Sequence, residues 1–267
     1  MRIRASLLVS AVLLASCGSS SSAPESSCPS PDLSGNVTVL AASSTKNVLT
    51  DLRDAYREAH PCVTDLTMSF GSSGELAVQI ANGAPADVFL AANEKTKDVV
   101  VTALNDQVKA ELIARNRMAI LVNSKSSFTS SIQKLTDLQD VVNPDIKVGV
   151  CVDSAPCGSI LPQLFEADEL DVSDVADTVA SSVQDLVTKV VMGELDAGIV
   201  FGSDCAQARK TQSALCVEIN QDLPRPISSP LYVVALNSKK NTQDFFDYLS
   251  SKETQLLLQK NYGFLAP

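Results

Sequence analysis

Serine residues stand at two points of the chain where an apolar strand gives way to an amphipathic helix. The two stretches are AASS at 41–44 and FGSSGEL at 70–76. A helix start carries unpaired backbone N–H groups and a partial positive charge, and a serine hydroxyl adds one more donor. Two such corners that face each other can hold a small anion without any charged side chain. The sequence therefore predicts an oxyanion site built from neutral donors.

Two further predicted helix starts follow small or hydroxyl residues, at Cys157-Gly158 and at Ser181-Ser182-Val183. Three glycines near two of the four corners, Gly71, Gly74 and Gly158, allow the backbone to come close to a ligand. If two corners belong to one lobe and two to another, the lobes form a clamp. Neutral donors favour a fully deprotonated oxyanion, because a protonated one also needs an acceptor.

The composition narrows the classes of function. The chain has 267 residues, with 21 Lys and Arg against 31 Asp and Glu, so its net charge is −10. This balance disfavours nucleic acid and anionic membranes as partners. The chain is not expected to be an enzyme, although a serine hydrolase is a competing hypothesis. It would have to use His60, the single histidine, and the stretch around Ser73 reads G-S-S-G rather than G-x-S-x-G.

Residues 1–16 are predicted to be a signal peptide. Arg2 and Arg4 precede an apolar run at 5–15 that is too short to span a bilayer. Without this segment, 19 basic residues face 31 acidic ones, and the net charge becomes −12. Residues 17–34 are expected to form a flexible tether, because this Ser/Pro-rich stretch has little to bury.

The end of the signal peptide, Leu14-Ala15-Ser16-Cys17, resembles a bacterial lipobox. That resemblance implies that Cys17 becomes a lipidated N-terminus, and several acyl chains give lasting membrane attachment. We therefore expect an exported protein that is anchored to the outer face of the cell membrane through lipid alone. Ordinary cleavage beside an incidental cysteine is the alternative.

Six further cysteines fit an oxidising compartment, and their even number suggests three disulfides. Proximity in the sequence favours the pairs Cys151–Cys157 and Cys205–Cys216, which leaves Cys28–Cys62. A zinc site is not expected, because the chain has no CxxC motif and no histidine near its cysteines. A redox-active pair is also disfavoured, since five residues separate Cys151 from Cys157.

Strands and helices alternate along the rest of the chain, which predicts an α/β fold with mostly parallel sheets. Strands are predicted at 37–41, 63–70, 87–91, 118–122, 147–150, 198–201 and 231–236. Helices are predicted at 44–60, 74–81, 94–104, 134–138, 158–170, 183–195, 243–249 and 252–261, the last with a capping box of Ser250 and Glu253. Ligands of such folds bind beyond the carboxyl ends of the strands, where the serine corners lie.

Four motifs resemble the periplasmic molybdate-binding proteins of ABC transporters. They are LAASS (40–44), FGSSGELAVQIANGAPADVFLAA (70–92), GELDAGIVFGSD (193–204) and NYGF (261–264), and the resemblance runs from about Val37 to Leu265. It implies a two-lobed periplasmic-binding-protein fold, type II-like, with helices on both sheet faces, crossing strands between the lobes and the anion in the cleft. Lobe one would comprise 35–117 and 236–267, and lobe two 118–235.

The same resemblance implies a set of ligand-binding residues. The hydroxyl donors fall on Ser44 and Ser73, and the backbone N–H donors fall on Cys157 and Val183. The family often has a tyrosine at the position of Phe201, whose phenyl ring cannot donate. Either the anion is then bound more weakly, or Ser43, Thr45, Ser154 or Ser203 supplies a substitute donor.

Asp153 lies next to the expected pocket loop, and two interpretations of it stay open. An inward carboxylate would repel a dianion and accept a hydrogen bond from a protonated oxyanion, whereas an outward one would only face solvent.

The resemblance further implies a monomeric receptor that delivers molybdate or tungstate to an ABC permease. It would use no cofactor, and the only metal would be the molybdenum of bound molybdate. A receptor of the same fold for another oxyanion, such as sulfate or phosphate, is the principal alternative.

Overall fold

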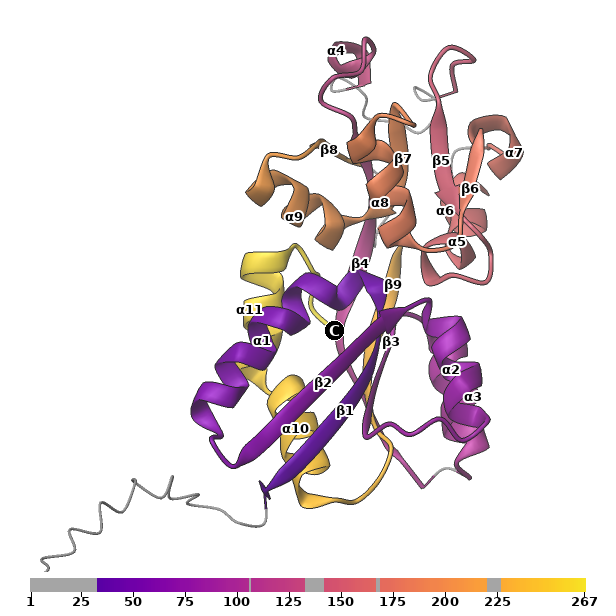
Figure 1. Cartoon of the computed structure of the whole chain (residues 1–267). Coiled ribbons are helices and arrows are strands. Elements are labelled where there is room, and N and C mark those ends of the chain that lie inside the picture. The colour runs from indigo at the N-terminus through magenta and orange to yellow at the C-terminus, as the bar shows by residue number, and fades with distance from the viewer. Residues whose placement is uncertain (1–32, 106, 133–141, 167–168, 220–226) are drawn as a thin grey trace, which may run out of the picture.

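The computed structural model describes residues 33–105, 107–132, 142–166, 169–219 and 227–267. The predicted signal peptide, Cys17, the tether, Cys28 and the helical piece predicted at 134–138 lie outside these ranges. The described strands form one continuous sheet in the order β2-β1-β3-β9-β4-β7-β5-β6, with β8 paired to β4. Figure 1 shows how this sheet runs through two lobes, one above the other.

The lower lobe contains three parallel strands that end at the lobe boundary. They are β1 (Gly35–Ala42), β2 (Val63–Gly71) and β3 (Val88–Ala91), with β1 in the middle. Helices α1 (Lys46–Ala59), α10 (Lys240–Ser250) and α11 (Lys252–Tyr262) cover one face, and α2 (Ser73–Ala81) and α3 (Glu94–Ala103) cover the other.

Side chains that point alternately to the two sides of each strand produce these two faces. In β1, Val39 and Ala41 pack among residues of α1 and α10, whereas Leu40 between them packs against α2. Successive side chains of a strand point to opposite sides of the sheet, so a fully apolar strand must be covered twice. This explains why each short buried strand needs helices on both faces.

The upper lobe repeats this plan around β5 (Val148–Cys151), β6 (Thr178–Ala180) and β7 (Ala197–Phe201). These strands are parallel to one another. The remaining elements of this lobe are α4 (Thr129–Ile132), α5 (Pro156–Ser159), α6 (Leu161–Glu166), α7 (Val172–Val175), α8 (Val183–Met192), α9 (Gly202–Thr211) and β8 (Leu215–Glu218). One hydrophobic core of residues between Met118 and Ala214 holds the lobe together.

Two long strands, β4 (Lys109–Val122) and β9 (Ser228–Ala235), run antiparallel between the lobes. Residues Ile113 and Ala114 of β4 belong to the lower core, and Met118–Val122 belong to the upper one. The prediction of an α/β fold with crossing strands is confirmed. The pairing is parallel within each lobe but antiparallel where β4 and β9 meet their neighbours.

Two local predictions were wrong in detail. The helix predicted at 158–170 is divided into α5 and α6, with Pro162 in the first turn of α6. Proline fits only the first turn of a helix, so it cannot lie within one continuous helix that starts at 158. The capping serine of α11 is Ser251, not Ser250, and it accepts from the N–H of Thr254.

Candidate functional site

The first serine corner lies where β1 leaves the sheet. A short 3-10 turn, Ser43–Thr45, follows Ala42 and leads directly into α1. The hydroxyl of Thr45 donates to the carbonyl of Ala42 at 2.7 Å, which fixes the turn. Ser44 is 8% exposed, and none of the described hydrogen bonds uses its hydroxyl.

The second corner lies where β2 meets α2. Ser73 is the first residue of the helix, is fully buried, and accepts from the N–H of Ala92 at 3.5 Å. Ser72 precedes it as the N-cap residue, but its side chain makes no capping hydrogen bond. The first-turn N–H groups of α2 therefore have no acceptors in their own helix and no cap from Ser72.

The upper lobe contributes two more helix starts. Cys157 is the second residue of α5, and Val183 is the first residue of α8. Ser182 caps α8 by accepting from the N–H of Asp185 at 3.2 Å, so its own proton stays available. At Gly158 a Cβ atom would lie 2.0 Å from the carbonyl oxygen of Val152, which explains why only glycine fits beside Cys157.

All four corners line one cavity at the junction of the lobes. It is narrow: the volume open to the centres of water-sized spheres is about 10 Å³, within about 200 Å³ of empty space that includes open solvent. Its walls are Ala42, Ser43, Ser44, Gly71, Ser72, Ser73, Ala155, Pro156, Cys157, Ser182, Val183 and Phe201. The structure thus brings together Ser44, Ser73, Cys157 and Val183, and it adds the predicted neighbours Ser43 and Phe201. No acidic or basic side chain belongs to this lining.

The missing tyrosine hydroxyl has only some of the expected substitutes. Ser43 lines the cavity, but Thr45 donates to Ala42 and Ser203 donates to the carbonyl of Ser44. Ser154 is exposed in a neighbouring groove. The sequence analysis missed Ser72 and Ser182 as lining residues. Ser72 could have been found, because it stands inside the FGSSGEL stretch.

Asp153 does not line this cavity. It is exposed, and it belongs to a groove of about 600 Å³ between α2, α3 and the loop before α5. This placement favours the outward interpretation of its carboxylate.

A buried carboxyl group lies directly behind the cavity wall. Asp204 follows Phe201 in the first turn of α9, and its Oδ2 atom is buried without a hydrogen-bond partner. Burial raises the pKa of Asp204 to about 7, although hydrogen bonds from the backbone at Phe201 and at Asp204 itself lower it. The side chain stands outside the lining, so it does not replace a ligand-binding group.

Asp87, in the stretch GAPADVF at 83–89, has a structural role. Asp87 accepts from the N–H of Thr38 at 2.8 Å, from Asn237 at 2.8 Å and from Lys239 at 2.9 Å. Burial raises the pKa of Asp87, but these hydrogen bonds and the lysine charge outweigh burial and hold it below its usual value. The carboxylate thus ties β1 to the segment that follows β9.

The histidine that an enzyme would need is remote from the cavity lining. His60 follows α1 and stacks on the ring of Tyr56, with 4.0 Å between ring centroids. Its Nε2 atom lies 3.3 Å from a carboxylate oxygen of Asp244. No serine of the cavity is paired with it among the described hydrogen bonds.

The cysteines follow the predicted pairing where the structure describes both partners. The sulfur atoms of Cys151 and Cys157 lie 2.10 Å apart, and those of Cys205 and Cys216 lie 1.95 Å apart. Cys62 is buried, and its predicted partner Cys28 lies outside the described ranges. Cys157 offers its backbone N–H to the cavity regardless of its sulfur chemistry.

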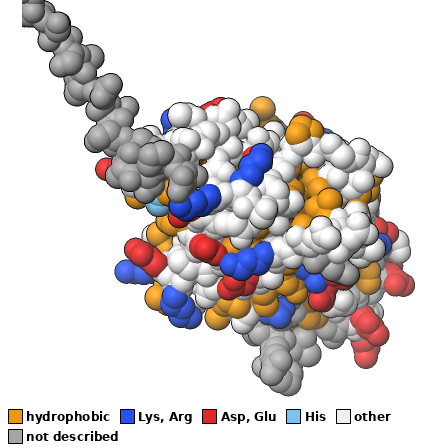
Figure 2. All heavy atoms as spheres, turned by 90° about the horizontal axis from the view of Figure 1, so that it is seen from below, with side chains coloured by type: hydrophobic (Ala, Val, Ile, Leu, Met, Phe, Trp, Pro, Cys, Tyr) orange, Lys and Arg blue, Asp and Glu red, His pale blue; other side chains and the backbone are white. Residues whose placement is uncertain are grey.

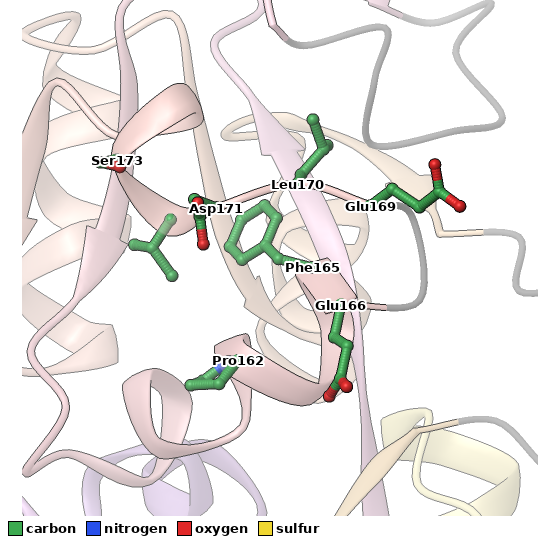
Figure 3. Close-up of a pocket in the computed structure, with 8 residues that line it drawn as sticks. Pro162, Phe165, Glu166, Glu169, Leu170, Asp171 and Ser173 are labelled. Atoms are coloured by element: carbon green, nitrogen blue, oxygen red, sulfur yellow. The ribbon is translucent and has the colours of Figure 1, made fainter.

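A larger hollow on the outside of the upper lobe is a poor anion site. Figure 3 shows Phe165 between Pro162 and Leu170, with the carboxylates of Glu166, Glu169 and Asp171 around the hollow. Three carboxylates repel an oxyanion. None of the predicted site residues lies there.

Surface charges and membrane features add two observations. On the face drawn in Figure 2, lysine and arginine side chains lie among acidic ones instead of forming one basic patch. Within the described ranges, no helix is both long and apolar enough to cross a membrane, and no cluster of His, Cys, Asp and Glu fits a metal ion.

Comparisons with known proteins agree with this architecture. The molybdate-binding protein ModA of Mycobacterium tuberculosis is 32% identical over 200 residues, which cover 74% of this chain and 73% of that protein. The ABC transporter substrate-binding lipoprotein YvgL of Bacillus subtilis, described as putative, is 27% identical over 97% of this chain and 95% of its own.

The solved structure of the sulfate-binding protein SubI from M. tuberculosis has the same fold. Its TM-score is 0.69 at 16% identity, with 86% of each chain covered. The family described as bacterial extracellular solute-binding protein matches residues 37–265, which is nearly all of the described fold. The chain therefore belongs to the bacterial extracellular solute-binding protein family.

Proposed function

We propose that this chain is the substrate-binding lipoprotein of an ABC importer and that it captures molybdate or tungstate. The observation that carries the proposal is the cavity itself, in which four helix starts and several hydroxyls converge without a charged side chain. Helix starts and hydroxyls are donors, so the species they suit is an anion with many acceptor oxygens.

The donor set favours a fully deprotonated oxyanion. A protonated oxyanion also needs an acceptor, and the strongest nearby acceptor, the carboxylate of Asp153, is exposed outside the lining. Molybdate, tungstate and sulfate carry no proton at neutral pH, whereas phosphate carries at least one. Phosphate is therefore the weakest of the four candidates.

The relatives support molybdate, and structural neighbours named for sulfate or phosphate support the alternative. ModA of M. tuberculosis is named for molybdate, and its identity of 32% exceeds that of the sulfate-binding SubI, which is 16%. Sulfate is a smaller tetrahedral dianion with the same donor requirement, so it is the second candidate ligand.

Calorimetric titration of the purified protein with molybdate, tungstate, sulfate and phosphate tests the proposal. We expect molybdate and tungstate to bind most tightly. Ser44→Ala and Ser73→Ala should each weaken binding at least about tenfold, since a hydrogen bond to a charged group contributes about 1.5–3 kcal/mol. Tighter binding of sulfate than of molybdate would favour the alternative, and binding of none of the four would refute the proposal.

The proposal extends to location and partners. We propose that residues 1–16 are removed, that Cys17 carries the lipid, that the cysteine pairs are oxidised after export, and that the monomeric receptor delivers its anion to a permease. The lipoprotein description of YvgL supports the anchor. Cys17→Ala should move the protein from the membrane fraction to the soluble fraction without changing anion affinity.

A further inference from the structure

Two polar residues face each other where the lobes join. Asn116 on β4 and Ser229 on β9 are register partners in the antiparallel ladder. Each is only 4% exposed, although both carry polar side chains. Buried polar groups are costly unless they are hydrogen-bonded, so their partners are informative.

Asn116 connects the ladder to the first serine corner. Its Nδ2 atom donates to the hydroxyl of Ser203 at 2.8 Å, and its Oδ1 atom accepts from the N–H of Ser203 at 3.3 Å. The Ser203 hydroxyl in turn donates to the carbonyl oxygen of Ser44 at 3.4 Å. The turn that carries Ser44 is thereby tied to the crossing strand and to the start of α9.

Ser229 connects the same rung of the ladder to the second corner. Its hydroxyl donates to the carbonyl oxygen of Ala92 in a short hydrogen bond. The N–H of Ala92 donates to the hydroxyl oxygen of Ser73 at 3.5 Å. Because Ser73 accepts this bond, its own proton is left for a group in the cavity.

We propose that Asn116 and Ser229 are positioning residues of the anion site. They do not line the cavity, but each acts through one intermediate residue on one of the two serines that do. Asn116 orients the turn of Ser44, and Ser229 orients the donor direction of Ser73. The proposal depends on the proposed function only in naming the anion that the two serines bind.

Two substitutions, each of which removes one hydroxyl group, test the two connections separately. Ser203→Ala removes the bond to Ser44, and Ser229→Ala removes the bond to Ala92. Each should weaken molybdate binding about 3- to 10-fold, because a neutral hydrogen bond contributes less than a charged one. Ser229→Thr keeps the hydroxyl and should restore most of the affinity.

A matched control separates positioning from plain loss of stability. The buried hydroxyl of Thr254 in α11 donates to the carbonyl of Tyr248 at 2.8 Å, away from the cavity lining. Thr254→Val removes this bond and also the one that the Thr254 hydroxyl accepts from Ser251 at 3.1 Å. It should lower the melting temperature at least as much as Ser229→Ala does, but leave anion affinity unchanged.

The wild type and all four variants are titrated with molybdate, sulfate and phosphate. The titrations are done at a temperature at which circular dichroism shows that every variant is folded. Weaker binding in Ser203→Ala and Ser229→Ala, with rescue by Ser229→Thr, supports the proposal for whichever anion the wild type prefers. Wild-type affinity in both alanine variants, or equal losses in Thr254→Val, overturns it while the proposed function stands. A wild-type chain that binds none of the three anions overturns both.

Discussion

At the scale of single residues, the proposed selection of an anion depends on which side chains the cavity lacks. The lining contains hydroxyls and helix-start N–H groups but no carboxylate and no cation. A cation would attract any anion. Neutral donors at fixed positions bind most tightly the anion whose oxygens reach all of them. Specificity then depends on donor number and spacing, and single hydroxyls become the natural targets for substitution.

Phe201 is the residue whose chemistry departs from the family pattern. Phe201→Tyr adds a hydroxyl to a buried wall of the cavity. We expect this variant to bind molybdate about tenfold more tightly, since a hydrogen bond to a charged group contributes at least about 1.5 kcal/mol. Calorimetric titration measures the change. Phe165→Tyr, in the core of the same lobe, is the control and should leave affinity unchanged. Unchanged affinity in Phe201→Tyr would mean that Ser43 or Ser72 already supplies this donor.

Asp204 should leave a signature in the pH dependence of stability. Its pKa is about 7 in the folded protein and near 3.8 when unfolded, so between these values the folded state holds a proton that the unfolded state has lost. Its contribution therefore makes the free energy of unfolding fall as pH rises from about 4 to about 7.

Asp204→Asn should flatten this part of the profile in denaturant titrations. At pH 8 the variant should be more stable than the wild type, by at most a few kcal/mol. Asp87 supplies an internal contrast, because its lowered pKa makes its contribution disappear only at acid pH, as the carboxylate is protonated. An unchanged slope between pH 4 and 7 in Asp204→Asn would contradict the assigned pKa.

At the scale of elements, close contact between α2 and the loop before α5 brings the lobes together. A Cβ atom on Gly74 would lie 2.7 Å from the backbone carbonyl of Ser154. Beside it, Asn93 donates to the hydroxyl of Ser159 at 3.2 Å across the same junction. Both contacts join the lower lobe to the upper one immediately outside the cavity.

Gly74→Ala should therefore weaken molybdate binding at least about tenfold, because the added methyl separates the donors of the two lobes. Alanine is also the better helix former, so helix α2 should gain rather than lose stability. Calorimetric titration and thermal melting of the same sample separate the two effects. Wild-type affinity in this variant would show that the lobes adjust around the methyl group.

Strongly periodic elements were predictable from the sequence, and so were the four corners. The strands of the lower lobe and helices α2, α3 and α8 begin within one or two residues of the predicted positions. The first half of β4 was missed, since Lys109–Arg117 is largely polar and its pairing comes from β9, far along the chain. The same reason hides the Asn116–Ser229 rung, because register between distant strands is not visible in local patterns.

The boundaries between the lobes are also hard to place from local sequence patterns. The predicted change at residue 117 comes from the resemblance to the family, and β4 passes from the lower core to the upper one between Ala114 and Met118. The predicted change at residue 235 stays a prediction. Leu231 and Val233 of β9 pack in the lower core, so burial alone gives an earlier position for the second crossing.

At the scale of the whole molecule, the electrostatic field and the site act in opposite directions. The chain has a net charge of −10, and removal of residues 1–16 would make it −12, yet the proposed guest is a dianion. Long-range repulsion slows the approach of an anion, whereas short-range donors in the cavity hold it after arrival. Exposed charges are screened by salt much more strongly than groups inside a narrow cavity.

The association rate constant of molybdate should therefore rise with ionic strength. Between about 0.01 M and 1 M the Debye length falls from about 30 Å to about 3 Å, which removes the repulsion. The dissociation rate should change little, because the contacts that hold the anion are buried and uncharged on the protein side. Stopped-flow kinetics over this range in sodium chloride measures both rates. An association rate that falls with salt would contradict this prediction and would indicate a cationic surface that guides the anion.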